Sequence, residues 1–373
     1  MGAKIMSDLD KYINDSLEKR KNEKLFRQLF LDEKGVDFIT NDYLGFSRLI
    51  NVETETEKHS PSASRLLGGN TKAIEDLEKH IAQFHGFETA LYFNSGYNAN
   101  TGLFACLLSR HDTYVFDEQV HASVRDGIRQ SLAQNFSFRH NDVNDLEEKI
   151  KHSKGNVVVA VESVYSMDGD TAPLVKLAET CKKHGASLIV DEAHSIGLFG
   201  KEGRGLVHEL KLTGDVFAVV YTYGKAMGCH GGAVACKANL RDYLVNFSRP
   251  FIYTTAPSNN QVLAVKTAYS LLTSPIREKN KLALRKNILF FVENMNAQSD
   301  DAVLHSHINN FMTGSNEKAI AIAQALRNKG FICRPVLSPT VAKGTERIRI
   351  NLHSYNTLDE IKNLVDAFKS LNG

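Results

Sequence analysis

One lysine follows closely on a run of apolar residues that is typical of a buried strand in a parallel sheet. The run covers residues 216–221, and the lysine comes in Thr222-Tyr223-Gly224-Lys225. Proteins with such sheets place their chemistry at the ends of the strands. There, apolar surroundings lower the pKa of a lysine and make its amine a nucleophile that can form a Schiff base with a carbonyl group. A solvated loop lysine has the same sequence signature, so the other strand ends must decide between the two interpretations.

A second apolar strand, residues 187–190, is followed by Asp191, and His194 comes three residues later. An aspartate in this position could cap a helix, ligate a metal ion or pair with a protonated ring nitrogen. The last role is the one that pyridoxal phosphate (PLP) requires. A carboxylate keeps its ring nitrogen protonated, and a nearby histidine can hydrogen-bond the ring 3-oxygen.

Two further strands end in polar residues. Residues 90–93 precede Asn94-Ser95-Gly96-Tyr97 and an apolar, helix-like run, so the backbone N–H groups at that helix start could bind a phosphate. Ser95 is an equally good plain helix cap. Residues 157–161 precede Glu162, and the turn signal Asp168-Gly169 comes shortly afterwards. Four strand ends of this kind in one chain favour a common site over four separate structural roles.

These segments together carry a family resemblance. Gly96-Tyr97, Glu162 with residues 166–170, residues 191–194 and residues 222–225 resemble the ordered motifs of the α-oxoamine synthases, which are PLP enzymes of fold type I. The resemblance extends from about Tyr12 to the C-terminus. Residues 41–45, 62–69 and 338–349 most resemble the branch of the family that condenses L-alanine with a pimeloyl thioester in biotin synthesis.

The resemblance implies an aminotransferase-like α/β fold with a mostly parallel central sheet, helices on both faces and a smaller α+β C-terminal domain. Strands and helices do alternate up to about residue 234. We predict an N-terminal helical segment at 1–37, a large cofactor-binding domain at 38–257, and a linking helix with the small domain at 258–373. Helices are predicted at 7–30, 71–85, 261–272, 319–329 and 358–371. The first should pack its apolar face against the body of the protein or a partner subunit.

The resemblance also implies roles for individual residues. Lys225, His121 and Asp191 are expected to be catalytic; without the resemblance, His121 would be a structural hydrogen-bonding residue. Arg349 is expected to bind the amino-acid carboxylate, because a guanidinium is a planar bidentate donor. The expected cofactor-binding residues are Gly96, Tyr97, Ser166, Asp191, His194, Thr222, Lys225 and Thr255. The expected substrate-binding residues are Arg27, Asn41, His121, Thr340 and Arg349.

Two of these roles have structural consequences. Thr255 is expected to reach the cofactor phosphate of a neighbouring subunit, which makes the active protein a homodimer with shared active sites. Arg27 is expected near the carboxylate of the acyl chain. The small-molecule substrates that follow are L-alanine and pimeloyl-coenzyme A or a pimeloyl-carrier protein.

Four other functions compete with this one. Glycine C-acetyltransferase and soluble serine palmitoyltransferase share the catalytic motifs, and Ser62-Ala63-Ser64-Arg65 is the feature that argues against them. A nicotinamide oxidoreductase would also be α/β, but no G-x-G-x-x-G follows a strand and no Walker A motif is present. A non-catalytic partner subunit on the same fold would be expected to lose the Schiff-base lysine, whereas Lys225 is present.

Composition is that of a soluble enzyme. The 373 residues are 42% hydrophobic and 24% charged with a net charge of +2, which does not favour binding to nucleic acid or to a membrane surface. The five cysteines form no C-x-x-C pair, as expected of free thiols in a reducing compartment, so no metal site is predicted. The sequence lacks a signal-like N-terminus and an apolar stretch long enough to cross a bilayer, so a cytoplasmic location is expected.

Overall fold

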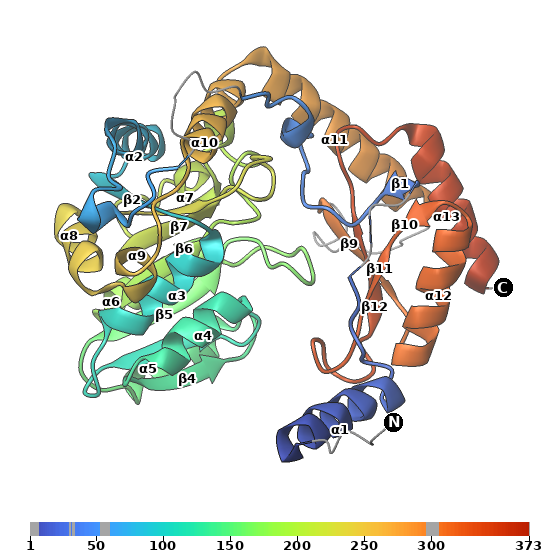
Figure 1. The fold of residues 1–373 in the computed structure, drawn as a ribbon, viewed down its shortest axis with the longest axis horizontal. Coiled ribbons are helices and arrows are strands. Elements are labelled where there is room, and N and C mark those ends of the chain that lie inside the picture. Colours follow the sequence, from blue (N-terminus) through green and yellow to red (C-terminus); the bar gives the residue numbers. More distant parts are fainter. Residues whose placement is uncertain (1–6, 30, 32–33, 53–59, 296–305, 373) are drawn as a thin grey trace, which may run out of the picture.

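The computed structural model describes residues 7–29, 31, 34–52, 60–295 and 306–372, which form a larger and a smaller lobe (Figure 1). The larger lobe contains a seven-stranded sheet and the smaller lobe a three-stranded sheet. Two consecutive helices, α10 (Asn259–Leu272) and α11 (Pro275–Asn294), lead from one lobe to the other. The predicted α/β fold with a smaller α+β C-terminal part is therefore confirmed.

The larger sheet has the strand order β2-β8-β7-β6-β5-β3-β4. Its strands are β2 (Thr89–Phe93), β3 (Thr113–Asp117), β4 (Gln134–Phe138), β5 (Val157–Glu162), β6 (Ser187–Asp191), β7 (Ala218–Thr222) and β8 (Gly232–Cys236). Within this sheet β8 is antiparallel to both neighbours, and the other neighbouring pairs are parallel. Since β2 and β7 both oppose β8, they point the same way. The carboxyl ends of β2, β5, β6 and β7 therefore meet at one edge.

Successive side chains of these strands enter two different cores. Val159 and Val161 of β5 belong to one apolar cluster, and Val158 and Ala160 belong to the other, as the two-residue period of a strand requires. The helices over the first face are α2 (Lys72–His85), α5 (Val143–Lys151), α6 (Leu174–Lys183), α7 (Leu206–Glu209) and α10. The helices over the second face are α3 (Gly96–Leu107), α4 (Ala122–Gln130), α8 (Ala238–Phe247) and α9 (Arg249–Ile252).

Helix α2 shows how local sequence sets such an element. The Thr71 side chain accepts a hydrogen bond from the Ile74 N–H at its start, and Gly86 ends it with a φ of 78° that suits glycine. Its apolar positions Ile74, Leu77 and Ile81 all face the core, as predicted. The described residues of this lobe also form three short 3₁₀ turns: Phe46–Arg48, Arg65–Leu67 and Lys201–Gly203.

The smaller lobe holds an antiparallel sheet of order β11-β12-β9, with strands β9 (Ile308–Met312), β11 (Arg334–Val336) and β12 (Arg347–Asn351). Helices α12 (Asn316–Asn328) and α13 (Leu358–Asn372) pack with it, close to their predicted positions. The short strand β1 (Val36–Asp37) pairs in parallel with β10 (Phe331–Ile332), so this early segment joins the smaller lobe. The domain boundaries at 37/38 and 257/258 stay predictions.

The first helix is shorter than predicted. A capping box at Ser7 starts α1 (Asp8–Asn22), and Lys24 with a φ of 57° follows its end. Residues 25–29 lie outside any helix, and Phe30 lies outside the described residues. No residue of α1 is buried, and Leu9 and Tyr12 are 66% and 69% exposed. The predicted packing against the body of the chain is therefore wrong, and packing against a partner subunit stays a prediction.

Among the described residues, no helix combines the length and the apolar character needed to cross a membrane.

Candidate active site

The edge where β2, β5, β6 and β7 end brings together the polar residues that follow them. Asp191 ends β6, and its register partner on β5 is Glu162. Thr222 ends β7, and Gly96 starts α3 directly beyond β2. Four segments that the sequence singled out separately therefore form one site.

A continuous chain of hydrogen bonds links Lys225 to Arg349. The Lys225 Nζ is 2.6 Å from His194 Nε2, and His194 Nδ1 is 2.8 Å from the Tyr43 hydroxyl. Tyr43 donates to Asn41 Oδ1 at 2.9 Å, and both terminal nitrogens of Arg349 lie 3.3 Å from that same oxygen. The predicted amine and the predicted carboxylate-binding guanidinium thus belong to one network that spans both lobes.

The charges along this network are set by burial. Burial, together with the charges of Lys225 and Arg349, holds the pKa of His194 well below its usual range, so His194 is neutral. Because Tyr43 donates to Asn41, His194 Nδ1–H donates to Tyr43 and Nε2 accepts from Lys225. Burial lowers the pKa of Lys225 to about 8, although the nearby Asp191 and Glu162 act to raise it. The unprotonated share of this amine near neutral pH is therefore larger than that of an ordinary lysine.

A second network holds Asp191. Its Oδ2 accepts from Asn100 Nδ2 at 2.7 Å, and its Oδ1 accepts from the Ala193 N–H at 2.9 Å. The same Asn100 nitrogen donates to Ser123 at 3.0 Å, and Ser123 lies 2.7 Å from His121 Nδ1. Burial and the charge of Lys225 lower the pKa of His121. Asp191 and His121, predicted from distant segments, are thus joined through two residues that the sequence analysis did not single out.

Glu162 also lies in this site, although the sequence analysis did not include it among the expected site residues. It is 2% exposed, and burial together with the adjacent Asp191 charge raises its pKa to about 8. Its Oε1 is buried with no hydrogen-bond partner in the part of the chain that the structure describes. A buried carboxyl group whose pKa is raised beside a charged neighbour is typical of functional sites.

Close packing characterises the region around Gly96. A Cβ on Gly96 would lie 1.9 Å from Thr222 Oγ1, and one on Gly232 would lie 2.8 Å from the Gly96 Cα. The Ser95 side chain caps α3 by accepting from the Asn98 N–H. The first N–H groups of α3 and the Thr222 hydroxyl therefore lie together, and a helix start of this kind binds anions well.

Four other predicted residues join neither these networks nor the Gly96–Thr222 contact in the single chain. Thr255 is exposed and pairs across a short bridge with Ser64. Tyr97 is 46% exposed, and its hydroxyl donates to Asp126. Thr340 is exposed in a turn after β11. Arg27 lines a cavity of about 790 Å³ between residues 24–29 and the surfaces of α12 and β11.

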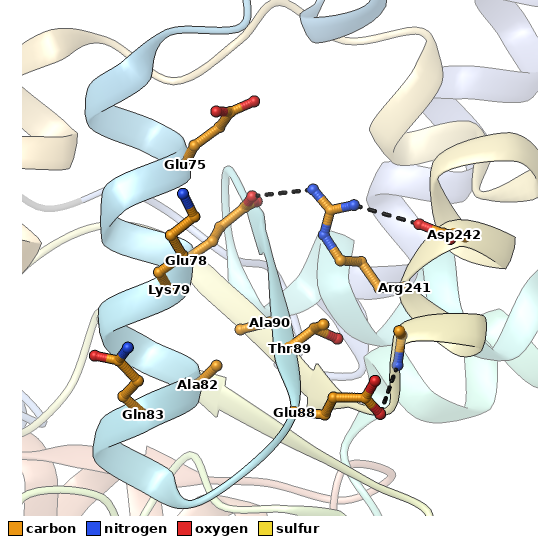
Figure 2. A pocket seen from close by; sticks show the side chains of 11 residues that line it. Glu75, Glu78, Lys79, Ala82, Gln83, Glu88, Thr89, Ala90, Arg241 and Asp242 are labelled. Atoms are coloured by element: carbon orange, nitrogen blue, oxygen red, sulfur yellow. Dashed lines mark hydrogen bonds and ion pairs between the residues drawn. The ribbon is translucent and has the colours of Figure 1, made fainter.

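Another hollow, of about 410 Å³, lies between α2 and α8 beside the edge strand β2 (Figure 2). Arg241 lies there between Glu78 and Asp242, 3.6 and 3.4 Å from their carboxylate oxygens. Buried Glu78 also binds Arg65, with Oε2 3.1 Å from Nη2, and so anchors the loop 62–69. No predicted site residue lines this hollow, and its charges hold that loop in place.

Comparison with known proteins then decides the family. The model of the class I and II aminotransferases matches residues 33–368. The chain belongs to this family. A relative named 8-amino-7-oxononanoate synthase from Emericella nidulans is 35% identical, over 97% of this chain and 96% of that protein. The comparison therefore agrees with the family that the sequence motifs indicated.

Similar solved structures support the same family. Serine palmitoyltransferase from S. paucimobilis, solved with a bound PLP–myriocin aldimine, superposes with a TM-score of 0.87 at 26% identity and covers 99% of this chain and 98% of that chain. An 8-amino-7-oxononanoate synthase from Francisella tularensis gives 0.74 at 29% identity and covers 91% and 98%. The resemblance to the α-oxoamine synthases is confirmed, and a nicotinamide oxidoreductase is excluded by the family.

Three residues of the networks were missed by the sequence analysis as site residues. Tyr43 lies inside a segment that carried the resemblance, but only its contact with His194 shows its place. Asn100 lies in the polar first half of α3 beside Asn98 and Thr101, so its residue type alone did not set it apart. Ser123 follows His121 by two residues and looks like an ordinary helix-start serine.

Proposed function

We propose that this protein is a PLP-dependent acyltransferase that condenses L-alanine with a pimeloyl thioester, with loss of carbon dioxide, to give 8-amino-7-oxononanoate. The observation that carries the proposal is the hydrogen-bonded chain from Lys225 through His194, Tyr43 and Asn41 to Arg349. It joins an amine of lowered pKa to a guanidinium suited to a carboxylate. The relative from Emericella nidulans supports the choice of reaction.

The residues present suit PLP. The absence of a Cβ at Gly96 leaves the Thr222 hydroxyl and the start of α3 close together, as a phosphate requires. Asp191, buried and held by Asn100, offers a carboxylate to a protonated ring nitrogen. When bound, PLP would supply the aldehyde that captures the amine and a ring that takes up electron density from the α-carbon. Gly96, Tyr97, Ser166, Asp191, His194, Thr222 and Lys225 are proposed to hold it.

The protein's own groups then move protons and hold charges. Lys225 takes the proton from the amino-acid α-carbon and returns it later, since its lowered pKa leaves it partly unprotonated. Neutral His194 accepts a hydrogen bond from Lys225 and directs its lone pair. His121, coupled to Asp191 through Ser123 and Asn100, would assist proton transfer to and from the substrate.

Substrate binding is assigned to the smaller lobe. Arg349, whose Nε donates to the Ser166 carbonyl at 2.7 Å, keeps its fork toward Asn41 and binds the amino-acid carboxylate. Arg27 faces a cavity with both cationic and apolar lining, which suits an acyl chain that ends in a carboxylate. Thr340 is proposed to contact the substrate or the product.

A homodimer with shared sites is part of the proposal. Thr255 is exposed, and Leu66 and Leu67 in the adjoining loop are 51% and 82% exposed, as residues awaiting a partner surface are. We propose that Thr255 binds the phosphate in the neighbouring subunit. Light scattering gives the mass, and mixing a Lys225→Ala with a Thr255→Ala protein should restore one functional site per mixed dimer. A cytoplasmic location is also proposed, because all five cysteines are free thiols.

A serine palmitoyltransferase activity is the second candidate. The observation in its favour is the TM-score of 0.87 with the S. paucimobilis enzyme, against 0.74 with the Francisella tularensis synthase. That activity would require serine with a long acyl chain. A glycine C-acetyltransferase and a non-catalytic subunit have no observation of this kind in their favour.

One experiment tests these alternatives together. The holoenzyme is offered alanine, glycine or serine, each with pimeloyl, acetyl or palmitoyl thioesters on coenzyme A or on a carrier protein, and the products are identified by mass spectrometry. We expect 8-amino-7-oxononanoate from alanine with a pimeloyl donor and none from the Lys225→Ala variant. A dominant product from serine and a palmitoyl donor would assign the protein to the second activity.

A further inference from the structure

His140 lies between two carboxylates at the base of the loop that follows β5. Its Nδ1 is 2.9 Å from an oxygen of Asp117, which ends β3, and its Nε2 is 2.8 Å from an oxygen of Asp170. A carboxylate ion can only accept hydrogen bonds, so each ring nitrogen must carry a proton. The ring is therefore an imidazolium, held by one fully buried and one largely buried acid.

The surroundings keep this ring charged. Burial disfavours the charged ring, but the hydrogen bonds and charges of Asp117 and Asp170 outweigh it and raise the pKa of His140 to about 10. The edge-on ring of Tyr165 lies 4.4 Å away, and the Glu118 carboxylate accepts the His140 backbone N–H at 3.2 Å. The cation is thus present throughout the neutral pH range.

Asp170 anchors one end of the loop formed by residues 163–172. The two ends of this loop pair with each other, since Val164 and Thr171 form an antiparallel bridge. Between its ends the loop extends from the larger lobe toward β9 and β12 of the smaller lobe (Figure 1). The Met167 carbonyl accepts from Asn310 Nδ2 on β9 at 2.8 Å.

The loop makes close contacts with the smaller lobe. Asp168 pairs with Arg347 on β12, and a Cβ on Gly169 would lie 2.5 Å from the Ile308 carbonyl oxygen. Two residues farther along β12, Arg349 Nε donates to the Ser166 carbonyl at 2.7 Å. A shift of the loop would therefore move the hydrogen-bond acceptor that orients the Arg349 fork.

We propose that His140 is a positioning residue for the amino-acid carboxylate: its cation fixes Asp170 and the loop 163–172, and the Ser166 carbonyl of that loop aims Arg349. The residue does not contact the substrate. The inference rests on the proposed function in one respect, the binding of a carboxylate by Arg349.

The test compares two ligands that differ in the carboxylate. L-alanine and L-alaninamide are titrated into the holoenzyme, and binding is followed by the change in cofactor absorbance. In His140→Gln we expect the affinity for L-alanine to fall roughly ten- to a hundredfold, because misplacement by about 1 Å has effects of this size. The affinity for L-alaninamide should change by less than about twofold, since it lacks the charge that Arg349 binds. Asp170→Asn should have the same selective effect.

His184→Gln is the matched control. His184 Nε2 is 2.8 Å from Glu147, so this variant also removes a histidine–carboxylate pair, but one outside the loop and the site. It should bind both ligands as the wild type does. Independently of the loaded enzyme, NMR of the cofactor-free protein should show both His140 ring nitrogens protonated up to about pH 10.

Several results would overturn the inference. Native alanine affinity in both His140→Gln and Asp170→Asn would show that the loop does not depend on this cation. An equal loss of affinity for alanine and alaninamide would show that His140 gives only general structural support. If the His140 ring titrates near its ordinary pKa, it is not charged at neutral pH and cannot act as proposed. Wild-type holoenzyme that binds neither ligand would overturn the proposed function, and this role with it.

Discussion

Adding one methyl group at Gly96 tests the proposed phosphate site. In Gly96→Ala the new Cβ would lie 1.9 Å from Thr222 Oγ1, 2.9 Å from its Cβ and 3.0 Å from its Cγ2. The first distance is roughly 1.5 Å short of ordinary contact, which begins at 3.4 Å. Thr222 ends β7 and is β-branched, so its side chain has few other rotamers. The hydroxyl or the start of α3 must therefore move.

The expected magnitudes follow from this clash. Overpacking should destabilise the cofactor-free protein by about 1–3 kcal/mol. If the Thr222 hydroxyl and the start of α3 hold the phosphate, losing one hydrogen bond to a charged group costs about 1.5–3 kcal/mol of binding free energy. At 1.4 kcal/mol per factor of ten, PLP should bind roughly 10- to 150-fold more weakly.

Two assays separate these effects. Urea denaturation of the cofactor-free protein gives the change in stability, and titration of PLP against the same protein gives its affinity. Gly214→Ala is the control, because a Cβ added there would meet no atom within 4 Å and its φ is not left-handed. That variant should keep the wild-type stability and PLP affinity within experimental error.

The double variant Gly96→Ala/Thr222→Ala sharpens the result. Removing the hydroxyl relieves the shortest contact, so part of the stability should return while the affinity for PLP stays low. The reasoning is refuted if Gly96→Ala is destabilised but binds PLP as tightly as the wild type. In that case the phosphate would be held elsewhere.

Four other predictions concern Lys225, Asp191 and the substrate. Borohydride reduction should fix the cofactor on Lys225, and peptide mapping of the adduct to another lysine would contradict the assignment. Lys225→Met should raise the melting temperature of the cofactor-free protein more at pH 7 than at pH 10. The folded pKa of Lys225 is about 8 against an ordinary 10.5, so its protonated form opposes folding, and this penalty fades as the pH rises from 8 to 10.5. Asp191→Asn should keep PLP but lose about a hundredfold or more in turnover, measured as thiol release, because an amide cannot hold the ring nitrogen protonated. With a pimeloyl donor, kcat/KM for alanine should exceed that for glycine by about ten- to a few-hundredfold, because glycine lacks one methyl contact. Serine should be disfavoured by about 1–3 kcal/mol, because its hydroxyl would be buried without a hydrogen-bond partner.

The sequence predicted best what depends on short segments. A strand followed by polar residues is a local pattern, and the four strand ends at 89–93, 157–162, 187–191 and 218–222 lie where the pattern placed them. The caps of α2 are local as well, because Thr71 and Gly86 act on their own helix. By contrast, the predicted extension of α1 to residue 30 relied on weak periodicity, and the left-handed Lys24 after its end had no sequence signal.

The contacts that complete the site join segments far apart in the chain. Tyr43 meets His194, and Asn41 meets Arg349, only because the early chain lies between the two lobes. The pairing of β1 with β10 is of the same kind. Two-residue strands and single polar side chains carry no periodicity, so no pattern in the sequence could indicate their partners.

The relative position of the lobes decides whether Arg349 can serve the site at Lys225, and α11 fixes it. Near its start, the buried Arg277 donates to the carbonyl groups of Gly197 and Leu198 in the larger lobe. Farther along, Asn287 donates to the carbonyl groups of His353 and Asn356 in the smaller lobe. A buried guanidinium and a buried amide are costly unless hydrogen-bonded, so each end of α11 is held to one lobe. Polar residues that interrupt the apolar face of this helix thus fix the distance between the two halves of the site.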